Sequence, residues 1–503
     1  MKKSRSGFNL ILCMFVSGVM LVNGIMLVSC ARPAAVSVPG KSTYDDLKPD
    51  SATDVEVTGS QEDVDTAVPE EPDDGPRPED DVDSDVSDRS DDDPADEEST
   101  DDPSLYKYIA SKDGLGEDAI CGAAININSI NDPVVMDIVH KHFNAVTLEN
   151  ELKMACMFGY NNAAYAPESI HEEELNGEKI MVPTIDHSQA DTILDELLKW
   201  NNENPDRKIR VRGHVLVWHS QAPEWFFHED YDASKAYVNK EVMDKRLEWY
   251  IKSMLEYYTG SGSKYKGMFY GWDVVNEAVS DSSGSYRTDE EEGDDHLSDP
   301  THSIKSSWWH VYKSNEFIKN AFKYANRYAP ADVELYYNDY NEFMSGKMGG
   351  IINLIRDVKN EPGTRIDGFG MQAHYTVGSP SAHQIALAAR KYAEVAGKVM
   401  LTELDVKAAP GYEVDKSDLD IEYVKQAKYY AAIYDELKKA EAEGYDISGI
   451  TVWGVRDSDS WLQTWSGAGG VADGKLRHYP LLFTADYKAK PAIWAFIDPS
   501  KIE

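Results

Sequence analysis

The sequence predicts an α/β protein in which a (β/α)₈ TIM barrel is preceded by a signal peptide and a disordered acidic linker. Three observations support this prediction. The chain starts with an apolar segment after a few basic residues, a strongly acidic segment follows, and from Leu105 onward short apolar runs alternate with amphipathic stretches. That alternation is typical of a parallel sheet whose strands are joined by helices.

The N-terminal segment has the order of charges and apolar residues seen in a secretory signal. Residues 1–5 are basic and residues 10–28 are apolar, so we expect residues 1–29 to be a signal peptide and the protein to be exported. The alternative is an uncleaved membrane anchor, because about 19 fairly apolar residues approach the length that spans a bilayer.

The end of this segment, Leu27-Val28-Ser29-Cys30, resembles the bacterial lipobox, in which the cysteine is lipidated and becomes the mature N-terminus. The resemblance implies a lipoprotein with acyl chains on Cys30 that anchor it to a membrane. Ala31 lacks the acidic character of a retention signal for the inner membrane, which favours the outer membrane or the cell surface.

Residues 30–103 form the second predicted element, an acidic tether. Residues 41–103 contribute about −22 of the formal charge of −39, and large apolar residues are scarce. Such a segment cannot bury enough apolar surface to offset the entropy of ordering it, so we expect a disordered spacer. The acidic charge also argues against nucleic-acid binding, because a phosphate backbone requires a basic protein surface.

Residues 104–503 form the third element, in which we predict eight strands that close into a barrel; an open, doubly wound sheet is the alternative. No internal repeat and no second domain is visible in the sequence. The helices are predicted from apolar residues at three- and four-residue spacing, as at Ile193, Leu194, Leu197 and Leu198. The predicted strands are 119–126, 143–149, 209–218, 268–277, 333–338, 368–374, 398–405 and 449–456, and the helices are 133–142, 189–201, 240–258, 317–328, 351–360, 382–396 and 422–442.

Two connections, 155–184 and 280–306, are longer than ordinary loops and contain no readable motif of their own. Both follow strands, so we expect them at the C-terminal end of the barrel, where long loops shape a cleft. Cys121 and Cys156 are predicted near opposite ends of neighbouring strands, too far apart for a disulfide. No cysteine or histidine spacing indicates zinc, and we expect no metal site.

Two carboxylates stand at the ends of predicted strands, Glu277 after Trp272-Asp273-Val274-Val275-Asn276 and Glu403 after Val399-Met400-Leu401-Thr402. Barrel enzymes place catalytic groups at this end of their strands. Either glutamate alone could form a salt bridge at the barrel rim. A facing pair is what cleavage of a glycosidic bond requires, with one group to protonate the leaving oxygen and one to meet the anomeric carbon.

Residues 105–503 resemble the glycoside hydrolase family 10 xylanases through seven motifs that occur in chain order. The motifs are Glu149-Asn150-x-x-Lys153, Arg212-Gly213-His214-x-x-x-Trp218-His219-x-Gln221-x-Pro223-x-Trp225, Trp272-Asp273-Val274-Val275-Asn276-Glu277-Ala278, Asn338-Asp339-Tyr340, Asp367-Gly368-x-Gly370-x-Gln372-x-His374, Thr402-Glu403-Leu404-Asp405 and Trp453-Gly454-x-x-Asp457-x-x-Ser460-Trp461. Each lies at a predicted strand end.

The resemblance implies an endo-β-1,4-xylanase that hydrolyses xylan with retention of configuration and needs no cofactor. Separately, we expect a monomer. Glu277 would be the general acid/base and Glu403 the nucleophile. His374 would orient Glu403, and Asp405 could fix the tautomer of that histidine. Asn276 would contact the sugar 2-hydroxyl.

The resemblance also implies a substrate-binding lining. Polar residues would pair with sugar hydroxyls, and tryptophans would pack against the sugar rings. These residues are Glu149, Asn150, Lys153, His214, Gln221, Gln372, Trp218, Trp453 and Trp461. The sequence departs from the family at Met154, where a tryptophan is usual, and in the longer acidic insertion after Glu277.

Two other functions fit the same sequence. The chain could be a retaining barrel hydrolase that acts on β-glucans or mixed substrates. It could also be a surface glycan-binding lipoprotein that has lost catalysis, although the presence of both Glu277 and Glu403 argues against this.

Overall fold

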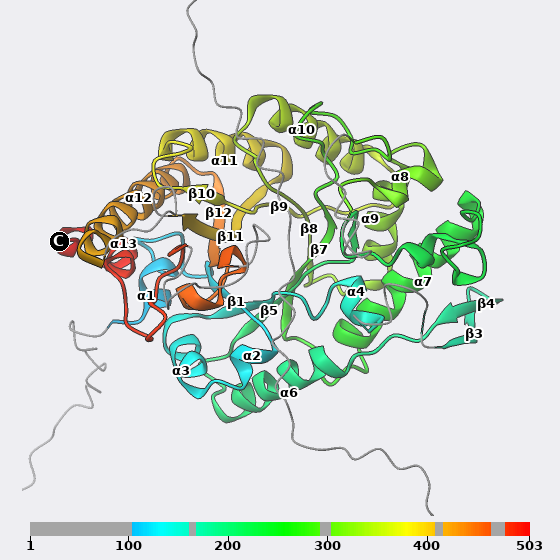
Figure 1. The fold of residues 1–503 in the computed structure, drawn as a ribbon, viewed down its shortest axis with the longest axis horizontal. Helices are drawn as coiled ribbons and strands as arrows, with labels where there is room; N and C mark the ends of the chain where they lie inside the picture. Colours follow the sequence, from blue (N-terminus) through cyan, green and yellow to red (C-terminus); the bar gives the residue numbers. More distant parts are fainter. Residues whose placement is uncertain (1–102, 160–166, 168, 292–302, 408–415, 464–477) are drawn as a thin grey trace, which may run out of the picture. The chain divides into compact units, whose positions relative to one another are not determined.

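Eight parallel strands of the described residues close into a barrel, and helices surround it (Figure 1). The structure is a computed structural model that describes residues 103–159, 167, 169–291, 303–407, 416–463 and 478–503. The predicted signal peptide, Cys30 and the acidic tether lie outside the described residues. The barrel strands are β1 (Ile120–Ile125), β2 (Ala145–Leu148), β5 (Arg210–Gly213), β7 (Phe269–Asn276), β8 (Glu334–Asp339), β9 (Gly368–Met371), β11 (Lys398–Lys407) and β12 (Asp446–Val452).

The pairing runs without a gap around this ring. β12 pairs with β1, and β9 pairs with β11 through Phe369 and Val399, so no barrel strand is left as an edge. The barrel prediction is therefore confirmed and the open doubly wound sheet is excluded. All of the ring pairings are parallel, which places the carboxyl ends of the strands at one end of the barrel.

Three predicted strands differ from the structure by more than one or two residues, because two of them are divided and one is shifted. The predicted strand 209–218 divides into β5 and β6 (Val217–Trp218), with a cis peptide bond between His214 and Val215. The predicted strand 368–374 divides into β9 and β10 (His374–Thr376) around Ala373, whose φ is 63°. The last strand spans Asp446–Val452 rather than 449–456.

The helices of the outer ring follow the predicted order. They are α3 (Pro133–His142), α6 (Ser188–Glu203), α7 (Lys240–Thr259), α9 (Glu316–Tyr328), α10 (Ser345–Asn360), α11 (Ala382–Ala396) and α12 (Lys416–Ala442). Both α10 and α12 begin about six residues before their predicted starts. The first turn of α10 contains glycines and few apolar residues, so the apolar spacing does not reveal it. Short elements are α1 (Leu105–Ile109), α2 (Ile127–Ile130), α4 (Met154–Met157), α8 (Ser307–Tyr312), α13 (Trp494–Ile497), and the 3₁₀ turns Glu224–Phe227, Glu229–Tyr231, Asp457–Asp459, Trp461–Gln463, Pro491–Ile493 and Pro499–Lys501.

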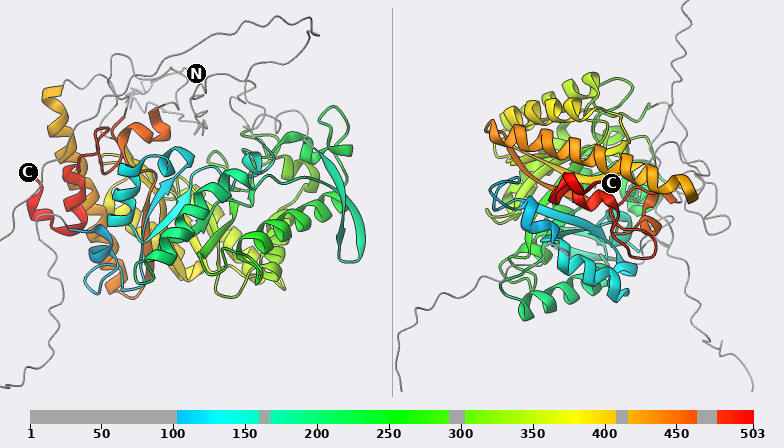
Figure 2. Two further views of the ribbon diagram at one scale, coloured as in Figure 1. Left: turned by 90° about the horizontal axis from the view of Figure 1, so that it is seen from below. Right: turned by 90° about the vertical axis from the view of Figure 1, so that its left-hand side faces the viewer.

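The long connection 155–184 contains a β-hairpin, so the expectation that it holds no motif is wrong. β3 (Ile170–Leu175) pairs antiparallel with β4 (Glu178–Pro183), at the edge of the described residues in Figure 2. Asn176 and Gly177 form the turn with φ of 54° and 84°, the conformation that an Asn-Gly hairpin requires. On the inner side, Glu173 accepts a hydrogen bond from the Trp249 indole of α7 at 2.9 Å.

The core lies between the barrel and its helices and includes both cysteines. Cys121 and Cys156 are buried and, as predicted, form no disulfide with each other. No helix within the described ranges combines the length and the apolar character needed to cross a bilayer.

One ion pair is enclosed between the end of β12 and the C-terminal segment. Lys490 Nζ lies 3.1 Å from Asp457 Oδ2, and neither side chain reaches solvent. Asp457 also accepts the Leu481 amide at 2.8 Å, and Lys490 donates to the Tyr479 carbonyl at 2.9 Å. Burial raises the pKa of Asp457 to about 6, although the Lys490 charge opposes this rise.

Replacing Lys490 with methionine should lower the free energy of unfolding by about 3–5 kcal/mol at neutral pH, because Asp457 would be buried without its cation. The loss should shrink as pH falls toward about 6 and be smallest below it, since Asp457 is then protonated in the wild type too and has no charge for Lys490 to pair with. Denaturant unfolding at several pH values measures both effects. Lys488→Met is the control, because Lys488 pairs with Asp486 at the exposed surface and should leave the unfolding midpoint nearly unchanged.

Candidate active site

The C-terminal end of the barrel brings Glu277 and Glu403 into one buried polar cluster. Glu277 follows the last residue of β7, and Glu403 lies on β11 two residues beyond the pair Leu401–Met371 that joins β11 to β9. Each glutamate is only 5% exposed. A buried carboxylate needs hydrogen-bond partners, and each one here has several.

Three amide side chains connect the two carboxylates. Gln372 Nε2 donates to Glu277 Oε1 at 2.9 Å and to Asn276 Oδ1 at 3.1 Å. Asn338 Nδ2 donates to the same Asn276 oxygen at 3.0 Å and to Glu403 Oε1 at 2.8 Å. The glutamates therefore belong to one continuous network across the end of the barrel.

The amide of Asn338 is held in its orientation from behind. Its Oδ1 accepts the Thr402 hydroxyl at 2.6 Å, so its nitrogen must face Asn276 and Glu403. Gly370 on β9 provides the space, because a Cβ at that position would lie 2.2 Å from Asn338 Oδ1. The motif at Asn338 was noticed in the sequence, but no role was assigned to the residue.

His374 and Asp405 lie behind Glu403 as the resemblance implied. His374 Nε2 is 3.3 Å from Glu403 Oε2, and its Nδ1 is 2.9 Å from Asp405 Oδ2. Trp461 donates its indole N–H to the same Asp405 oxygen at 2.8 Å. Burial opposes a charge on His374, but the two carboxylates outweigh it and raise the pKa of His374 to about 10.

A second histidine, His214, approaches Glu403 from the position that directly follows β5. His214 Nε2 is 4.0 Å from Glu403 Oε1, and its Nδ1 is 2.9 Å from Asp273. Asp273 is also bound by two nitrogens of Arg212, a fully buried side chain, at 2.5 and 3.0 Å. Strand periodicity gave no means of separating Arg212 and Asp273 from ordinary core positions.

The surroundings move the pKa values of the two glutamates in opposite directions. Burial acts to raise the pKa of Glu403, but the His374 hydrogen bond and the charges of His214, His374 and Lys153 leave it below its ordinary value. For Glu277, burial dominates over the Gln372 hydrogen bond and raises the pKa. One group therefore favours the ionised form and the other the protonated form, an arrangement that separates acid and nucleophile roles.

Glu277 has an unusual backbone conformation. Its φ is 54°, in the left-handed region that costs a residue with a side chain about 1–3 kcal/mol. His219 Nε2 lies 4.0 Å from Glu277 Oε2. The buried Arg287, from the connection 280–306, donates to the Glu277 carbonyl at 2.9 Å. Arg287 carries no signal in the sequence, because it lies ten residues beyond the predicted strand end at Glu277.

The remaining polar residues of the predicted lining lie on the β2 side. Lys153 donates to Asn150 at 3.2 Å and lies 5.1 Å above the Trp218 ring. Asn126 donates to Glu149 at 2.8 Å. Burial raises the pKa of Glu149 to about 7, against the opposing effects of Asn126 and Lys153.

Lys153 lies between this side and the cluster around Glu277 and Glu403, because its charge lowers the pKa of both Glu149 and Glu403. Gln221 lies next to α4, where its carbonyl accepts the Ala155 amide at 2.8 Å. The Trp453 ring meets the His214 ring edge-on with centroids 5.5 Å apart. Every predicted lining residue thus lies at the C-terminal end of the barrel or in the loops that follow it.

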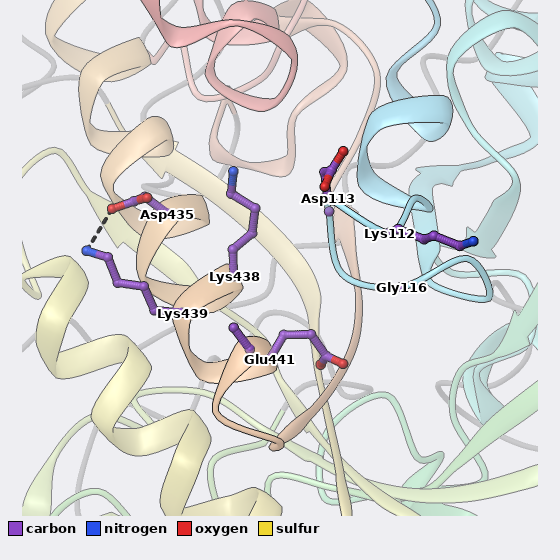
Figure 3. A pocket seen from close by; sticks show the side chains of 9 residues that line it. Lys112, Asp113, Gly116, Asp435, Lys438, Lys439 and Glu441 are labelled. Atoms are coloured by element: carbon purple, nitrogen blue, oxygen red, sulfur yellow. Dashed lines mark ion pairs between the residues drawn. The ribbon is translucent and has the colours of Figure 1, made fainter.

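A hollow of about 520 Å³ elsewhere in the barrel unit has a different character. It lies between the segment after α1 and the C-terminal half of α12, and none of the candidate site residues line it (Figure 3). Its charges compensate one another, since Lys439 lies 2.8 Å from Asp435. Across the part of the chain that the structure describes, no group of three or more His, Cys, Asp or Glu residues is arranged to hold a metal ion.

Comparisons with known proteins point to one family. The family described as glycosyl hydrolase family 10 matches residues 111–499. The chain is 32% identical over 375 residues to the bifunctional endo-1,4-beta-xylanase XylA of Ruminococcus flavefaciens, covering 74% of this chain and 32% of that protein. It is 31% identical to endo-1,4-beta-xylanase A of Xylanibacter ruminicola, covering 76% of this chain and 91% of that protein.

A solved structure gives the same picture. The CBM22-1–GH10 modules of the Clostridium thermocellum endo-1,4-beta-D-xylanase 10B, complexed with xylohexaose, match with a TM-score of 0.62 and 29% identity, covering 80% of this chain and 68% of that one. The chain spans only about a third of the length of the first curated relatives that it matches.

Proposed function

We propose, from the premise that this chain belongs to glycosyl hydrolase family 10, that it is an endo-β-1,4-xylanase that cleaves xylan with retention of configuration. One observation carries the proposal: two buried glutamates share one hydrogen-bond network, and their pKa values are shifted in opposite directions. The xylanase relatives favour xylan over other β-glycans as the substrate.

The first half of the reaction breaks the glycosidic bond. Glu277, protonated because burial raises its pKa, gives its proton to the glycosidic oxygen as the bond to the anomeric carbon breaks. Glu403, ionised, attacks that carbon from the opposite face and forms a covalent glycosyl–enzyme. The leaving chain departs with a new hydroxyl group. This mechanism requires carboxyl groups about 5–5.5 Å apart, with no water between them.

The second half releases the sugar. Glu277, now ionised, takes a proton from water, and the resulting hydroxyl attacks the anomeric carbon and frees Glu403. Two inversions give net retention. The proton taken from water restores the protonated Glu277, and Glu403 leaves the sugar as a carboxylate, so the chemistry proposed for these residues needs no cofactor.

The supporting residues act through Glu403 and the sugar. His374, kept cationic by its raised pKa, stabilises the Glu403 carboxylate and is itself oriented by Asp405. Asn276 lies between the glutamates, where its amide can meet the sugar 2-hydroxyl. The lining of Glu149, Asn150, Lys153, His214, Gln221 and Gln372, with Trp218, Trp453 and Trp461, would bind the xylose units on either side of the cleaved bond.

The direct test compares substrates and products. Purified protein should release reducing sugar faster from glucuronoxylan or arabinoxylan than from carboxymethyl-cellulose, and NMR of the first product should show the β-anomer. Faster hydrolysis of the cellulose derivative would favour the β-glucanase alternative. An α-anomer as the first product would exclude the double displacement.

The dependence of kcat/KM on pH should be bell-shaped. It should rise as Glu403 loses its proton and fall as Glu277 loses its proton. Since the Glu403 pKa is lowered, the acid limb should lie below the ordinary carboxyl value of about 4.3. The basic limb should lie above that value, because the Glu277 pKa is raised. Initial rates on xylohexaose from about pH 3 to pH 9 measure both limbs; an acid limb above the ordinary value would contradict the proposed environment of Glu403.

We also propose that residues 1–29 are a lipoprotein signal, that Cys30 is acylated, and that residues 30–103 tether the barrel to the outer membrane or cell surface. The lipobox-like ending and the acidic composition support this. Labelling cells with a clickable fatty acid should mark the wild-type protein and not Cys30→Ala; label on the variant would reject the anchor. Protease added to intact cells should remove the barrel domain if it faces outward.

We further propose that the protein acts as a monomer, since all of the side chains assigned above come from one chain. Light scattering on the purified barrel domain should give the mass of a single chain. Activity that falls on dilution would indicate instead that an oligomer is required.

A further inference from the structure

The backbone that carries Glu277 is held at all four of its polar groups. The Glu277 amide donates to the Asn338 carbonyl at 2.9 Å, and the Ala278 amide donates to the Tyr337 hydroxyl at 3.0 Å. Arg287 holds the other two groups. Its Nε donates to the Glu277 carbonyl at 2.9 Å, and its backbone amide donates to the Ala278 carbonyl at 2.8 Å. One residue of the connection after β7 therefore closes this turn.

The turn needs such support because of the conformation of Glu277. Its φ of 54° is in the left-handed region, which a residue with a side chain keeps only where its surroundings hold it. The direction of the Glu277 carboxyl follows from that backbone. A partner that fixes both carbonyls of the turn thus also fixes where the carboxyl points.

Arg287 is itself rigidly placed. Its side chain is 6% exposed, and its remaining nitrogens donate to the Tyr340 hydroxyl and to the Ile304 carbonyl, each at 3.1 Å. A guanidinium is planar and carries its donors in fixed directions, so three acceptors around it leave little freedom. Because Arg287 itself cannot move far, its hydrogen bond holds the Glu277 carbonyl in one position.

We propose that Arg287 is a positioning residue for the proton-transfer step, which holds the Glu277 carboxyl in line with the glycosidic oxygen. This inference rests on the proposed function, because it assigns a role within that reaction. Part of the long connection 280–306 would then orient the acid/base Glu277 in addition to shaping the cleft. Arg287 does not touch the sugar and acts through the backbone of Glu277 and Ala278.

The charges around Glu277 provide a second way to detect this role. His219, 4.0 Å away, faces its carboxyl, and the Arg287 charge lowers the pKa of Glu277 against the larger raising effect of burial. The Lys347 charge also lowers the pKa of Glu277, and the Asp339 charge raises it. These two groups lie 2.9 Å apart, so their effects on Glu277 partly cancel. Removing the Arg287 charge should therefore raise the pKa of Glu277 further.

The test uses Arg287→Met and Arg287→Lys with two substrates. For Arg287→Met we expect kcat/KM on xylohexaose to fall about 10- to 100-fold, because a small misplacement of a catalytic group has an effect of that size. On a dinitrophenyl β-xylobioside, whose leaving group needs no proton, the loss should be at most about threefold. The basic limb of the pH profile should move to higher pH.

Arg287→Lys separates charge from geometry. It keeps a cation but not the planar donor pattern, so its basic limb should remain nearer to the wild type while its rate on xylohexaose still falls. If Arg287→Met proves too unstable to measure, Arg287→Lys with the substrate comparison still decides the matter. Equal losses on both substrates in Arg287→Lys would overturn the proposal.

Arg246→Met is the matched control. Arg246 is also buried and also donates to two carbonyls, those of Phe226 and His228, but it makes no contact with Glu277. We expect a lower unfolding midpoint, similar effects on both substrates and an unmoved basic limb. A wild-type protein without activity on xylan would contradict the proposed function, whereas an active wild type with an unaffected Arg287→Met would contradict this inference alone.

Discussion

Replacing Glu403 with alanine should lower kcat on xylan by about 10⁴- to 10⁶-fold, as expected when a nucleophile is removed from a group of residues that act together. The covalent intermediate cannot form without this carboxylate. The dissociation constant for xylohexaose should change little, because the sugar-binding residues remain in place. Reducing-sugar release and calorimetric titration of the variant measure the two effects.

The Glu403→Ala variant also allows a test of geometry. A small anion such as azide can occupy the vacated space and attack the anomeric carbon from the side of the nucleophile. The product of an activated aryl xyloside should then have the α-configuration, opposite to that of normal hydrolysis. Glu248→Ala is a control, because Glu248 pairs with Arg327 on the outer helices and should keep nearly full activity. A Glu403→Ala variant with near wild-type turnover would refute the assigned nucleophile.

Replacing Glu277 with alanine should have an effect that depends on the leaving group. On xylan, kcat/KM should fall about 10²- to 10⁴-fold, the usual contribution of a general acid. On a dinitrophenyl β-xylobioside, formation of the glycosyl–enzyme should be nearly unaffected and its hydrolysis should become slow, so a burst of released phenol should precede a slow steady state. Stopped-flow absorbance records the burst.

Two further results should accompany Glu277→Ala. The basic limb of the pH profile should disappear, because the group that titrates there is gone. Added azide should accelerate turnover and give a β-configured product, the reverse of the result for Glu403→Ala. An α-configured product from Glu277→Ala together with a β-configured product from Glu403→Ala would show that the two roles are exchanged.

Much of the fold could be predicted because each barrel element has a local signal. The eight strand regions are short apolar runs, and α11 even begins with a capping box in which Ser381 and Gln384 bond each other's backbone amides. The predictions erred at the C-terminal strand ends, as at Ala373, where the chain leaves extended geometry to direct polar side chains. The Asn176-Gly177 hairpin turn was also missed, although this dipeptide is a strong turn signal.

The candidate site was predictable to the extent that its residues stand at strand ends. Glu277, Glu403, His374 and Asp405 all do, and the structure brings them together. The residues that fix their orientation have no such signal. Asn338 depends on a hydroxyl 64 positions further along the chain, and Arg287 depends on the backbone shape of a distant turn, neither of which periodicity can reveal.

The Gln372 and Asn338 amides between the glutamates are fixed in orientation, because each directs its nitrogen to one carboxylate and to the shared Asn276 oxygen. Turning the Asn338 amide over would set oxygen against oxygen at both Asn276 and Glu403, and nitrogen against the Thr402 hydroxyl. Both glutamates accept an amide hydrogen from this chain, so the difference between acid and nucleophile comes from the other groups around them, the burial of Glu277 and the histidines beside Glu403. A xylan chain would therefore meet two carboxyl groups whose pKa values already differ, and exchanging their roles would require changing the groups around each glutamate rather than the amides between them.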